Sequence, residues 1–135
     1  MNETILLVPD EAAMRELGQD LLRSLNVGDV VLLSGELGAG KTTIVRGALE
    51  SIGYPGPVRS PTFSLIQLYA TEPPVLHADL YRVNSLKGLD LIELLDRNIS
   101  FVEWPERASE LSEMPGTIKV QIEFSEAGRT VKITR

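Results

Sequence analysis

The residues with the clearest chemistry lie between Gly35 and Thr43, in the sequence Gly-Glu-Leu-Gly-Ala-Gly-Lys-Thr-Thr. Their spacing matches the phosphate-binding pattern G-x-x-x-x-G-K-[ST] without a misfit. Glycines allow the backbone to curl so that successive N–H groups point inward at phosphate oxygens. Lys41 can bridge the outer phosphates, and the Thr42 hydroxyl can ligate Mg²⁺. We therefore expect a nucleotide to bind along the residues Leu37, Gly38, Ala39, Gly40, Lys41, Thr42 and Thr43.

The segments around this motif fit the same interpretation. Residues 30–34 form an unbroken run of valine and leucine ended by serine, which is typical of a strand buried on both faces. Residues 41–52 place apolar side chains on one side of a predicted helix, and Gly53 is a typical helix end. A phosphate-binding loop needs a strand before it and a helix after it, and the helix N-terminus adds a partial positive charge. The alternative is a glycine turn followed by a surface lysine.

A phosphate-binding loop also needs an acid that holds the metal, usually at the end of a buried strand. Two acids qualify: Asp79 follows residues 75–78 of one expected strand, and Glu103 follows residues 99–102 of another. Both are expected at the carboxyl edge of the sheet, where ligands bind in open α/β folds. For either acid alone, the alternative is a surface carboxylate at a strand end. The sequence does not decide which of the two orients the attacking water.

A threonine between the loop helix and the next strand is a further candidate. In switch-type nucleotidases a threonine at this place senses the terminal phosphate and the metal. Here Thr62 lies in the sequence Ser60-Pro61-Thr62-Phe63. The alternative is a proline turn that leads into a strand.

The roles of His77, Trp104 and Arg82 stay open. His77 is the only histidine, so histidines cannot form a metal cluster here. A strand histidine is more often structural than catalytic. Trp104 fits the core, the wall of the site or a partner surface. Arg82 fits either a contact to phosphate charge or a solvated surface position.

Strands alternate with helices along the chain, which favours a layered α/β domain with a mixed sheet. Asp10 is the expected N-cap of the first helix. An antiparallel hairpin is expected near the C-terminal end, around the turn at 125–129. The expected strands cover 4–8, 30–34, 63–69, 75–81, 99–103, 117–124 and 130–134, and the expected helices cover 11–25, 41–52, 86–96 and 106–112.

Length and charge limit the function classes. The 135 residues are enough for one domain, which we expect to span 1–135. A net charge of −6 makes independent binding to nucleic acid unfavourable, because that affinity comes mostly from Lys and Arg. The absence of cysteine excludes disulfides and cysteine metal sites, and it fits a cytoplasmic protein. Apolar runs fall far short of the roughly 20 residues that cross a membrane, so no membrane role is expected.

Four motifs in this order resemble the bacterial TsaE family, also called YjeE, which contains the small ATPases of tRNA threonylcarbamoyladenosine biosynthesis. The resemblance covers nearly the whole chain. The loop alone is common to many nucleotidases, whereas the four motifs at these separations are highly specific. They are the phosphate-binding loop, Ser60-Pro61-Thr62-Phe63, His77-Ala78-Asp79-Leu80-Tyr81-Arg82 and Val102-Glu103-Trp104-Pro105-Glu106.

The resemblance implies a fold and an activity. It implies a three-layer α/β/α nucleotidase fold around a mixed, mainly parallel sheet. It implies binding of ATP or ADP with Mg²⁺, weak ATP hydrolysis by the chain alone, and partnership with TsaD and TsaB homologues. In that system the ATP cycle resets the TsaB–TsaD transferase, so contact with tRNA is expected only indirectly through the complex.

The resemblance also implies roles for single residues. Thr42 and Glu103 correspond to the residues that hold Mg²⁺, and Asp79 to an aspartate needed for ATP hydrolysis, direct or through water at the metal. Thr62 corresponds to a switch-like element. Two further nucleotide contacts correspond to Glu11, at the start of the first helix, and Arg129, in the C-terminal hairpin.

Two other function classes remain open. A small-molecule kinase also uses a phosphate-binding loop, but it needs an acceptor pocket and usually an arginine-bearing lid. A nucleotide-binding regulator without hydrolysis shares most of the same residues. ATP is preferred over GTP because the chain contains no [N/T]-K-x-D segment, which reads guanine.

Overall fold

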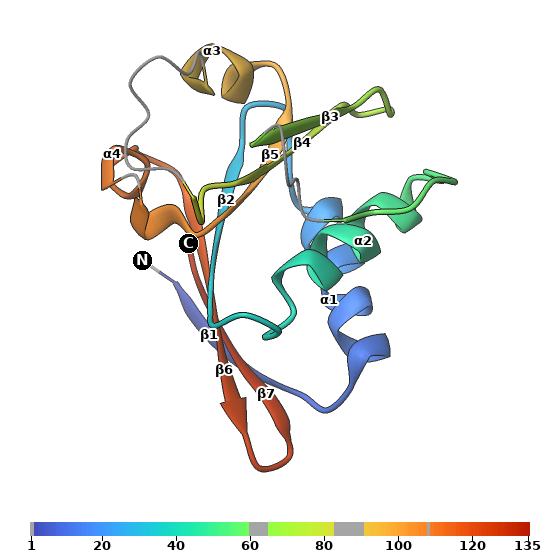
Figure 1. Ribbon diagram of the computed structural model, residues 1–135, viewed down its shortest axis with the longest axis vertical. Helices are drawn as coiled ribbons and strands as arrows, with labels where there is room; N and C mark the ends of the chain where they lie inside the picture. Colours follow the sequence, from blue (N-terminus) through green and yellow to red (C-terminus); the bar gives the residue numbers. More distant parts are fainter. Residues whose placement is uncertain (1, 60–64, 83–90, 108) are drawn as a thin grey trace.

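A single seven-stranded sheet forms the centre of the computed structural model, which describes residues 2–59, 65–82, 91–107 and 109–135. The strands follow one another across the sheet in the order β1-β7-β6-β2-β5-β4-β3 (Figure 1). The strands are β1 (Glu3–Val8), β2 (Val30–Ser34), β3 (Ile66–Tyr69), β4 (Val75–Asp79), β5 (Ile99–Glu103), β6 (Ile118–Ser125) and β7 (Gly128–Thr134). The helices are α1 (Glu11–Arg23), α2 (Lys41–Ser51), α3 (Leu91–Asp96) and α4 (Ser109–Ser112), with a 3₁₀ turn η1 (Pro105–Arg107).

The sheet is mixed and mainly parallel, as expected. Strands β6, β2, β5 and β4 are mutually parallel neighbours in its middle. Strand β7 pairs antiparallel with both β6 and β1, and β3 pairs antiparallel with β4. The predicted C-terminal antiparallel hairpin is therefore confirmed as β6–β7.

Helices cover both faces of the sheet, which gives the three layers that the resemblance implied. Helices α1 and α2 lie on one side and α3 and α4 on the other (Figure 1). Along β2, Val31 and Leu33 belong to the core beneath α1 and α2, whereas Val30 and Leu32 belong to the core on the other face. All four are buried, as predicted for a strand covered on both faces.

Two glycines allow α1 and α2 to pack with their backbones in near contact. A Cβ atom at Gly18 would lie 2.0 Å from the carbonyl oxygen of Ile44, and one at Gly47 would lie 2.0 Å from that of Arg15. Such distances leave no space for any larger residue. This packing fixes the start of α1 relative to the helix that follows the phosphate-binding loop.

Several boundaries differ from expectation. Strand β4 ends at Asp79 instead of 81, because the Asp79 side chain accepts a hydrogen bond from the Tyr81 backbone N–H and turns the chain. Helix α1 begins after its predicted N-cap, Asp10, but ends at Arg23 instead of 25, where the Ser24 hydroxyl bonds the Leu21 carbonyl oxygen. The helix expected at 106–112 is divided into η1 and α4.

Parts of two other expected elements lie outside the described residues. Of the helix expected over 86–96, the structure describes Leu91–Asp96 as α3, and of the strand expected over 63–69 it describes Ile66–Tyr69 as β3. Thr62 and the motif around it also lie outside the described residues, so the predicted switch role of Thr62 stays a prediction.

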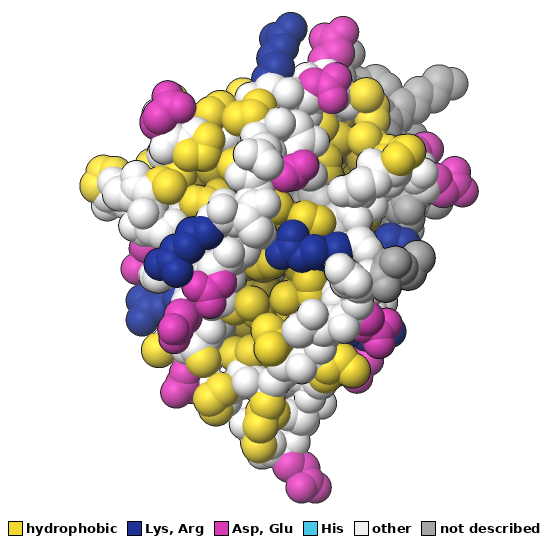
Figure 2. Space-filling model, turned by 180° about the vertical axis from the view of Figure 1, so that it is seen from behind, with side chains coloured by type: hydrophobic (Ala, Val, Ile, Leu, Met, Phe, Trp, Pro, Cys, Tyr) yellow, Lys and Arg dark blue, Asp and Glu magenta, His cyan; other side chains and the backbone are white. Residues whose placement is uncertain are grey.

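The surface combines charged and apolar areas. Figure 2 shows acidic and basic side chains around exposed apolar side chains on the side opposite to Figure 1. Among the exposed apolar residues are Ile5 and Leu7 on the edge strand β1. No helix within the described ranges is long and apolar enough to cross a membrane.

The helix contact predicts the sign of a stability change. On helix propensity alone, Gly18→Ala would stabilise the protein by about 1 kcal/mol. Because the added Cβ meets the backbone of α2, we expect the free energy of unfolding instead to fall by about 1–3 kcal/mol. Urea denaturation measures this change. Gln19→Ala, at the neighbouring half-buried position, is the control and should change stability by less than about 0.5 kcal/mol. A more stable Gly18→Ala variant would contradict the close packing.

Candidate functional site

The phosphate-binding loop connects β2 to α2 and leaves backbone donors available at the helix start. Gly40 is the N-cap of α2, with a φ of 121°, a conformation that side chains disfavour. In the part of the chain that the structure describes, no side chain caps this helix end. The first intrahelical acceptor is the Gly40 carbonyl, which takes the N–H of Ile44. The N–H groups of the first turn are therefore suited to bind an anion, as the motif predicts.

Lys41, the loop lysine, is folded against its own loop. Its side-chain amine donates to the carbonyl oxygens of Gly35 and, at 3.3 Å, of Glu36. The same nitrogen lies 3.9 Å from the ring centre of Trp104. Only 5% of the residue is exposed. The charge is thus held by weak neutral partners, which an anionic phosphate can replace.

Burial and neighbouring acids act in opposite directions on Lys41. Burial lowers the pKa of its amine, and this effect exceeds the opposing attraction of Glu103, Glu106 and Asp79, so the pKa lies below the ordinary value of 10.5. The negative charge of these three carboxylates favours the binding of a further cation close to Lys41. A nucleotide with a bound metal ion carries both charges that such a site needs.

The two predicted acids meet at the edge of the sheet next to the loop. Asp79 and Glu103 are direct neighbours in the parallel pairing of β4 and β5. The Thr42 hydroxyl donates to Oε2 of Glu103 at 2.9 Å. A cavity of about 220 Å³ is lined by Leu37–Thr43, Asp79, Glu103 and Trp104. The structure therefore brings together the loop and both acids, as the sequence predicted.

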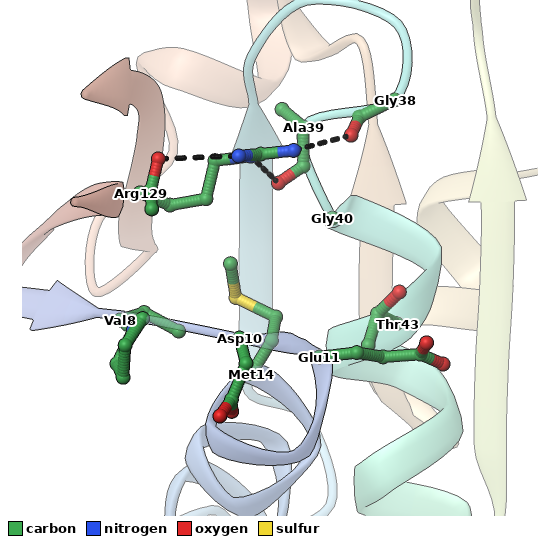
Figure 3. A pocket seen from close by; sticks show the side chains of 11 residues that line it. Val8, Asp10, Glu11, Met14, Gly38, Ala39, Gly40, Thr43 and Arg129 are labelled. Atoms are coloured by element: carbon green, nitrogen blue, oxygen red, sulfur yellow. Dashed lines mark hydrogen bonds between the residues drawn. The ribbon is translucent and has the colours of Figure 1, made fainter. Parts of the chain in front are cut away.

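A second cavity adjoins the loop on the side of α1 and has a volume of about 240 Å³. Glu11 and Arg129 both line it, although they come from the first helix and the C-terminal hairpin. Figure 3 shows these two side chains on either side of the cavity, with Met14 between them. The other lining residues include Val8, Pro9, Asp10, Gly38, Ala39, Gly40, Thr43 and Gly128.

Arg129 ties the hairpin to the phosphate-binding loop. Its guanidinium donates to the carbonyl oxygens of Ala39 at 3.2 Å and Gly38 at 3.4 Å (Figure 3). It also lies over the ring of Phe124, 4.2 Å from the ring centre. These contacts hold the outer part of the loop in place. Arg129 thus lines the second cavity and is also hydrogen-bonded to the loop.

The side chain of Glu11 is paired with a residue of α2. Arg46 forms an ion pair with it at 3.3 Å and donates to the Val58 carbonyl oxygen at 3.2 Å. The pair is partly exposed, so its contribution to stability is modest. Its effect is to set the direction of the Glu11 side chain beside the second cavity.

His77, Trp104 and Arg82, whose roles the sequence left open, differ in their burial and in their contacts with the site. His77 is fully buried, and its Nε2 lies 2.5 Å from Oε2 of Glu103. Trp104 forms part of the wall of the 220 Å³ cavity and has a φ of 60°, with its ring 4.8 Å from that of Tyr81. Arg82 is exposed.

Some residues of the site were not predicted. None of Met14, Arg46 and Phe124 was singled out from the sequence. Phe124 follows from the hairpin: it pairs with Arg129 across β6 and β7, and a register counted outward from the turn would have indicated the contact. The contact of Arg46 could not be predicted from the sequence, because its partner Glu11 lies on another helix.

A family model described as "Threonylcarbamoyl adenosine biosynthesis protein TsaE" matches residues 8–132. The chain belongs to the TsaE family. Relatives with the name "tRNA threonylcarbamoyladenosine biosynthesis protein TsaE" include that of Streptomyces coelicolor, which is 46% identical over 74% of this chain and 73% of its own. The relative from Aquifex aeolicus is 35% identical over 96% of this chain and 95% of its own.

A solved structure supports the same fold. The crystal structure of YdiB from Bacillus subtilis has a TM-score of 0.77, with 24% sequence identity, over 98% of this chain and 83% of that one. At this identity the likeness concerns the fold alone. It agrees with an α/β domain built around a phosphate-binding loop, as expected for a TsaE family member.

Within the described ranges, no group of three or more His, Asp and Glu side chains is placed to hold a metal ion by itself. A metal bound together with a nucleotide needs fewer protein ligands, because the phosphates and water supply the others.

The lowered pKa of Lys41 predicts a pH dependence of stability. Between the pKa of folded Lys41 and 10.5, the unfolded chain binds more protons than the folded one, so the free energy of unfolding rises with pH. We expect the difference between wild type and Lys41→Met to shift in favour of wild type as pH rises from neutral toward 10.5. Urea denaturation across that range measures it. Lys132→Met, at a more exposed lysine of β7, controls for the loss of one charge. A difference that stays constant with pH would contradict the prediction.

Proposed function

We propose that this chain is a Mg²⁺-dependent ATPase that acts as the nucleotide-driven accessory protein of tRNA N6-threonylcarbamoyladenosine formation. One observation carries the proposal: the loop threonine Thr42 is hydrogen-bonded to Glu103, and both line a cavity together with residues 37–43 of the phosphate-binding loop. Membership in the TsaE family, and the names of the relatives, support the pathway.

The residues present fit a bound Mg²⁺. Mg²⁺ prefers oxygen ligands, and the polar side chains at the cavity include the hydroxyl of Thr42 and the carboxylates of Glu103 and Asp79. These three would hold the ion, directly or through water. When bound, it would neutralise charge on the outer phosphates.

The loop would hold the phosphates. Residues at the start of α2 line the first cavity, where their N–H groups would bind phosphate oxygens and Lys41 would provide a positive charge. Phosphate oxygens would take over the amine from the carbonyl oxygens of Gly35 and Glu36, since a charged acceptor binds an ammonium more strongly than a neutral one.

The second cavity would hold the nucleoside. It continues from Gly38–Gly40 and Thr43 of the loop toward Glu11 and Arg129, and Val8, Pro9 and Met14 give it apolar walls. A purine ring needs apolar surface with a few polar groups at its edge. We infer that the base is adenine, because the chain contains no [N/T]-K-x-D segment that would read guanine.

Catalysis would rest on positioning and electrostatics, because phosphoryl transfer leaves little covalent work to the protein. Oε2 of Glu103 already receives the hydroxyl of Thr42, which favours a role for Glu103 at the metal. Asp79 lines the same cavity from the next strand, and we assign it to the attacking water. Thr62 is proposed to respond to the terminal phosphate.

Partners would complete the site. Hydrolysis is expected to be slow for the chain alone and faster with TsaD and TsaB homologues, if a charge-stabilising group or the ordering of a switch comes from them. With a net charge of −6, contact with tRNA would pass through those partners in the cytoplasm.

Removal of the loop amine tests nucleotide binding. In Lys41→Ala we expect the affinity for MgADP to fall by about 100-fold or more, because a buried, paired charge is lost. Isothermal titration calorimetry measures the affinity. Lys119→Ala, at an exposed lysine of β6, should bind like wild type. Equal affinity in Lys41→Ala and wild type would exclude the loop as the phosphate site.

Removal of the Glu103 charge tests the catalytic step. In Glu103→Gln the side chain keeps its size, and we expect nucleotide binding without Mg²⁺ to persist while ATP turnover falls by at least about 100-fold. Phosphate release in the presence of the TsaB and TsaD homologues measures turnover. Glu123→Gln, at an exposed acid of β6, is the matched control. Normal turnover in Glu103→Gln would remove Glu103 from the mechanism, and no phosphate release from wild type with its partners would refute the ATPase assignment.

A further inference from the structure

The side chain of His77 is buried beneath the site and has no role in the proposed mechanism. It is the only histidine of the chain, and none of its surface is exposed. It lies on β4, two residues before Asp79, so both side chains point to the face of the sheet that carries α2. Its Nε2 lies 2.5 Å from Oε2 of Glu103 on the neighbouring strand β5.

The hydrogen-bonding pattern defines which ring nitrogen carries a hydrogen. A carboxylate only accepts hydrogen bonds, so Nε2 of His77 donates to Glu103. The other nitrogen, Nδ1, is buried and has no partner among the described residues. A buried lone pair without a donor is costly, and an apolar side chain at this position would avoid that cost. The polar contact that the histidine makes is therefore the one to Glu103.

Two donors among the described residues hold Oε2 of Glu103. Nε2 of His77 approaches it from β4, and the hydroxyl of Thr42 approaches it from α2 at 2.9 Å. Glu103 is 3% exposed, so water does not replace a missing donor easily. Without His77, the carboxylate would be free to turn away from Thr42.

From this arrangement we propose that His77 is a positioning residue for the metal site. It fixes the Glu103 carboxylate so that the Thr42 hydroxyl hydrogen points to Glu103, which would leave the oxygen lone pairs of Thr42 available to a metal ion. His77 thereby sets how much Mg²⁺ strengthens nucleotide binding. The inference rests on the proposed function, since it concerns the same nucleotide site.

A purely structural histidine makes a different prediction. If His77 only fills space in the core, its replacement changes stability and affects nucleotide binding equally with and without Mg²⁺. If it positions Glu103, its replacement weakens binding only where Mg²⁺ takes part. The ratio of the two affinities separates the two roles.

The experiment measures ADP affinity by calorimetry in Mg²⁺ and in EDTA for the full chain. The variants are His77→Leu, which removes the donor; His77→Asn, whose amide is too short to reach Glu103; and His77→Gln, whose amide nitrogen replaces Nε2. Ser100→Ala is the matched control, because Ser100 is also fully buried on β5 and its hydroxyl has no partner among the described residues.

We expect His77→Leu and His77→Asn to lose about 10- to 100-fold of the affinity gained from Mg²⁺, as for other residues that orient a metal ligand. Affinity in EDTA should stay unchanged, and His77→Gln should recover most of the loss. If His77→Leu does not fold, the comparison of His77→Asn with His77→Gln carries the test, since both keep a polar side chain.

Three results would overturn the inference. Equal losses with and without Mg²⁺ would assign His77 to the core, and an unchanged Mg²⁺ gain in His77→Asn or His77→Leu would show that Glu103 is positioned without it. In both cases wild type still binds the nucleotide, so the proposed function stands. Failure of wild type to bind ADP at all would instead refute the proposed function, and the inference with it.

Discussion

A buried carboxylate at the end of β5 is the constraint on which the site depends. Glu103 is almost fully removed from water, and an isolated charge in such a place is very unfavourable unless it is paired and hydrogen-bonded. The chain supplies a hydroxyl from α2 and a ring N–H from β4, and the attraction between Glu103 and the Lys41 amine adds a cation. The positions of the loop, of α2 and of β4 are therefore linked through one side chain.

The arrangement of helices extends this constraint to the second cavity. Gly18 and Gly47 bring α1 so close to α2 that the start of α1 has little freedom to move relative to the loop. Glu11 is the first residue of α1, and Arg46 on α2 forms an ion pair with it. A residue near the start of the chain thus becomes part of a site whose centre lies on the loop.

Much of this arrangement is readable from the sequence, because local rules determine it. The loop spacing, the apolar residues 30–33 of β2 and the acids at the ends of β4 and β5 are each recognised from a few adjacent residues. The carboxyl edge of a parallel sheet then brings Asp79 and Glu103 together.

The remaining contacts depend on which strands are neighbours. The contact between His77 and Glu103 requires β4 to lie beside β5. The hydrogen bond from Arg129 to Gly38 requires the β6–β7 hairpin to lie beside β2. A single sequence holds no record of strand order. The left-handed backbone of Trp104 was unpredictable for a related reason, since it depends on a turn between β5 and η1 that no glycine marks.

The pairing of β1 with β7 has a consequence for how the protein is made. Strand β1 is synthesised first among the described strands, yet the partner to which it hydrogen-bonds, β7, is synthesised last of them. Contacts of such wide sequence separation form late, because the intervening chain must be ordered first. Arg129, which clasps the loop, lies on β7 as well. A chain still emerging from the ribosome therefore contains the loop sequence before the contacts of Arg129 restrain the loop, and the proposed nucleotide affinity would develop only once the final strand has formed.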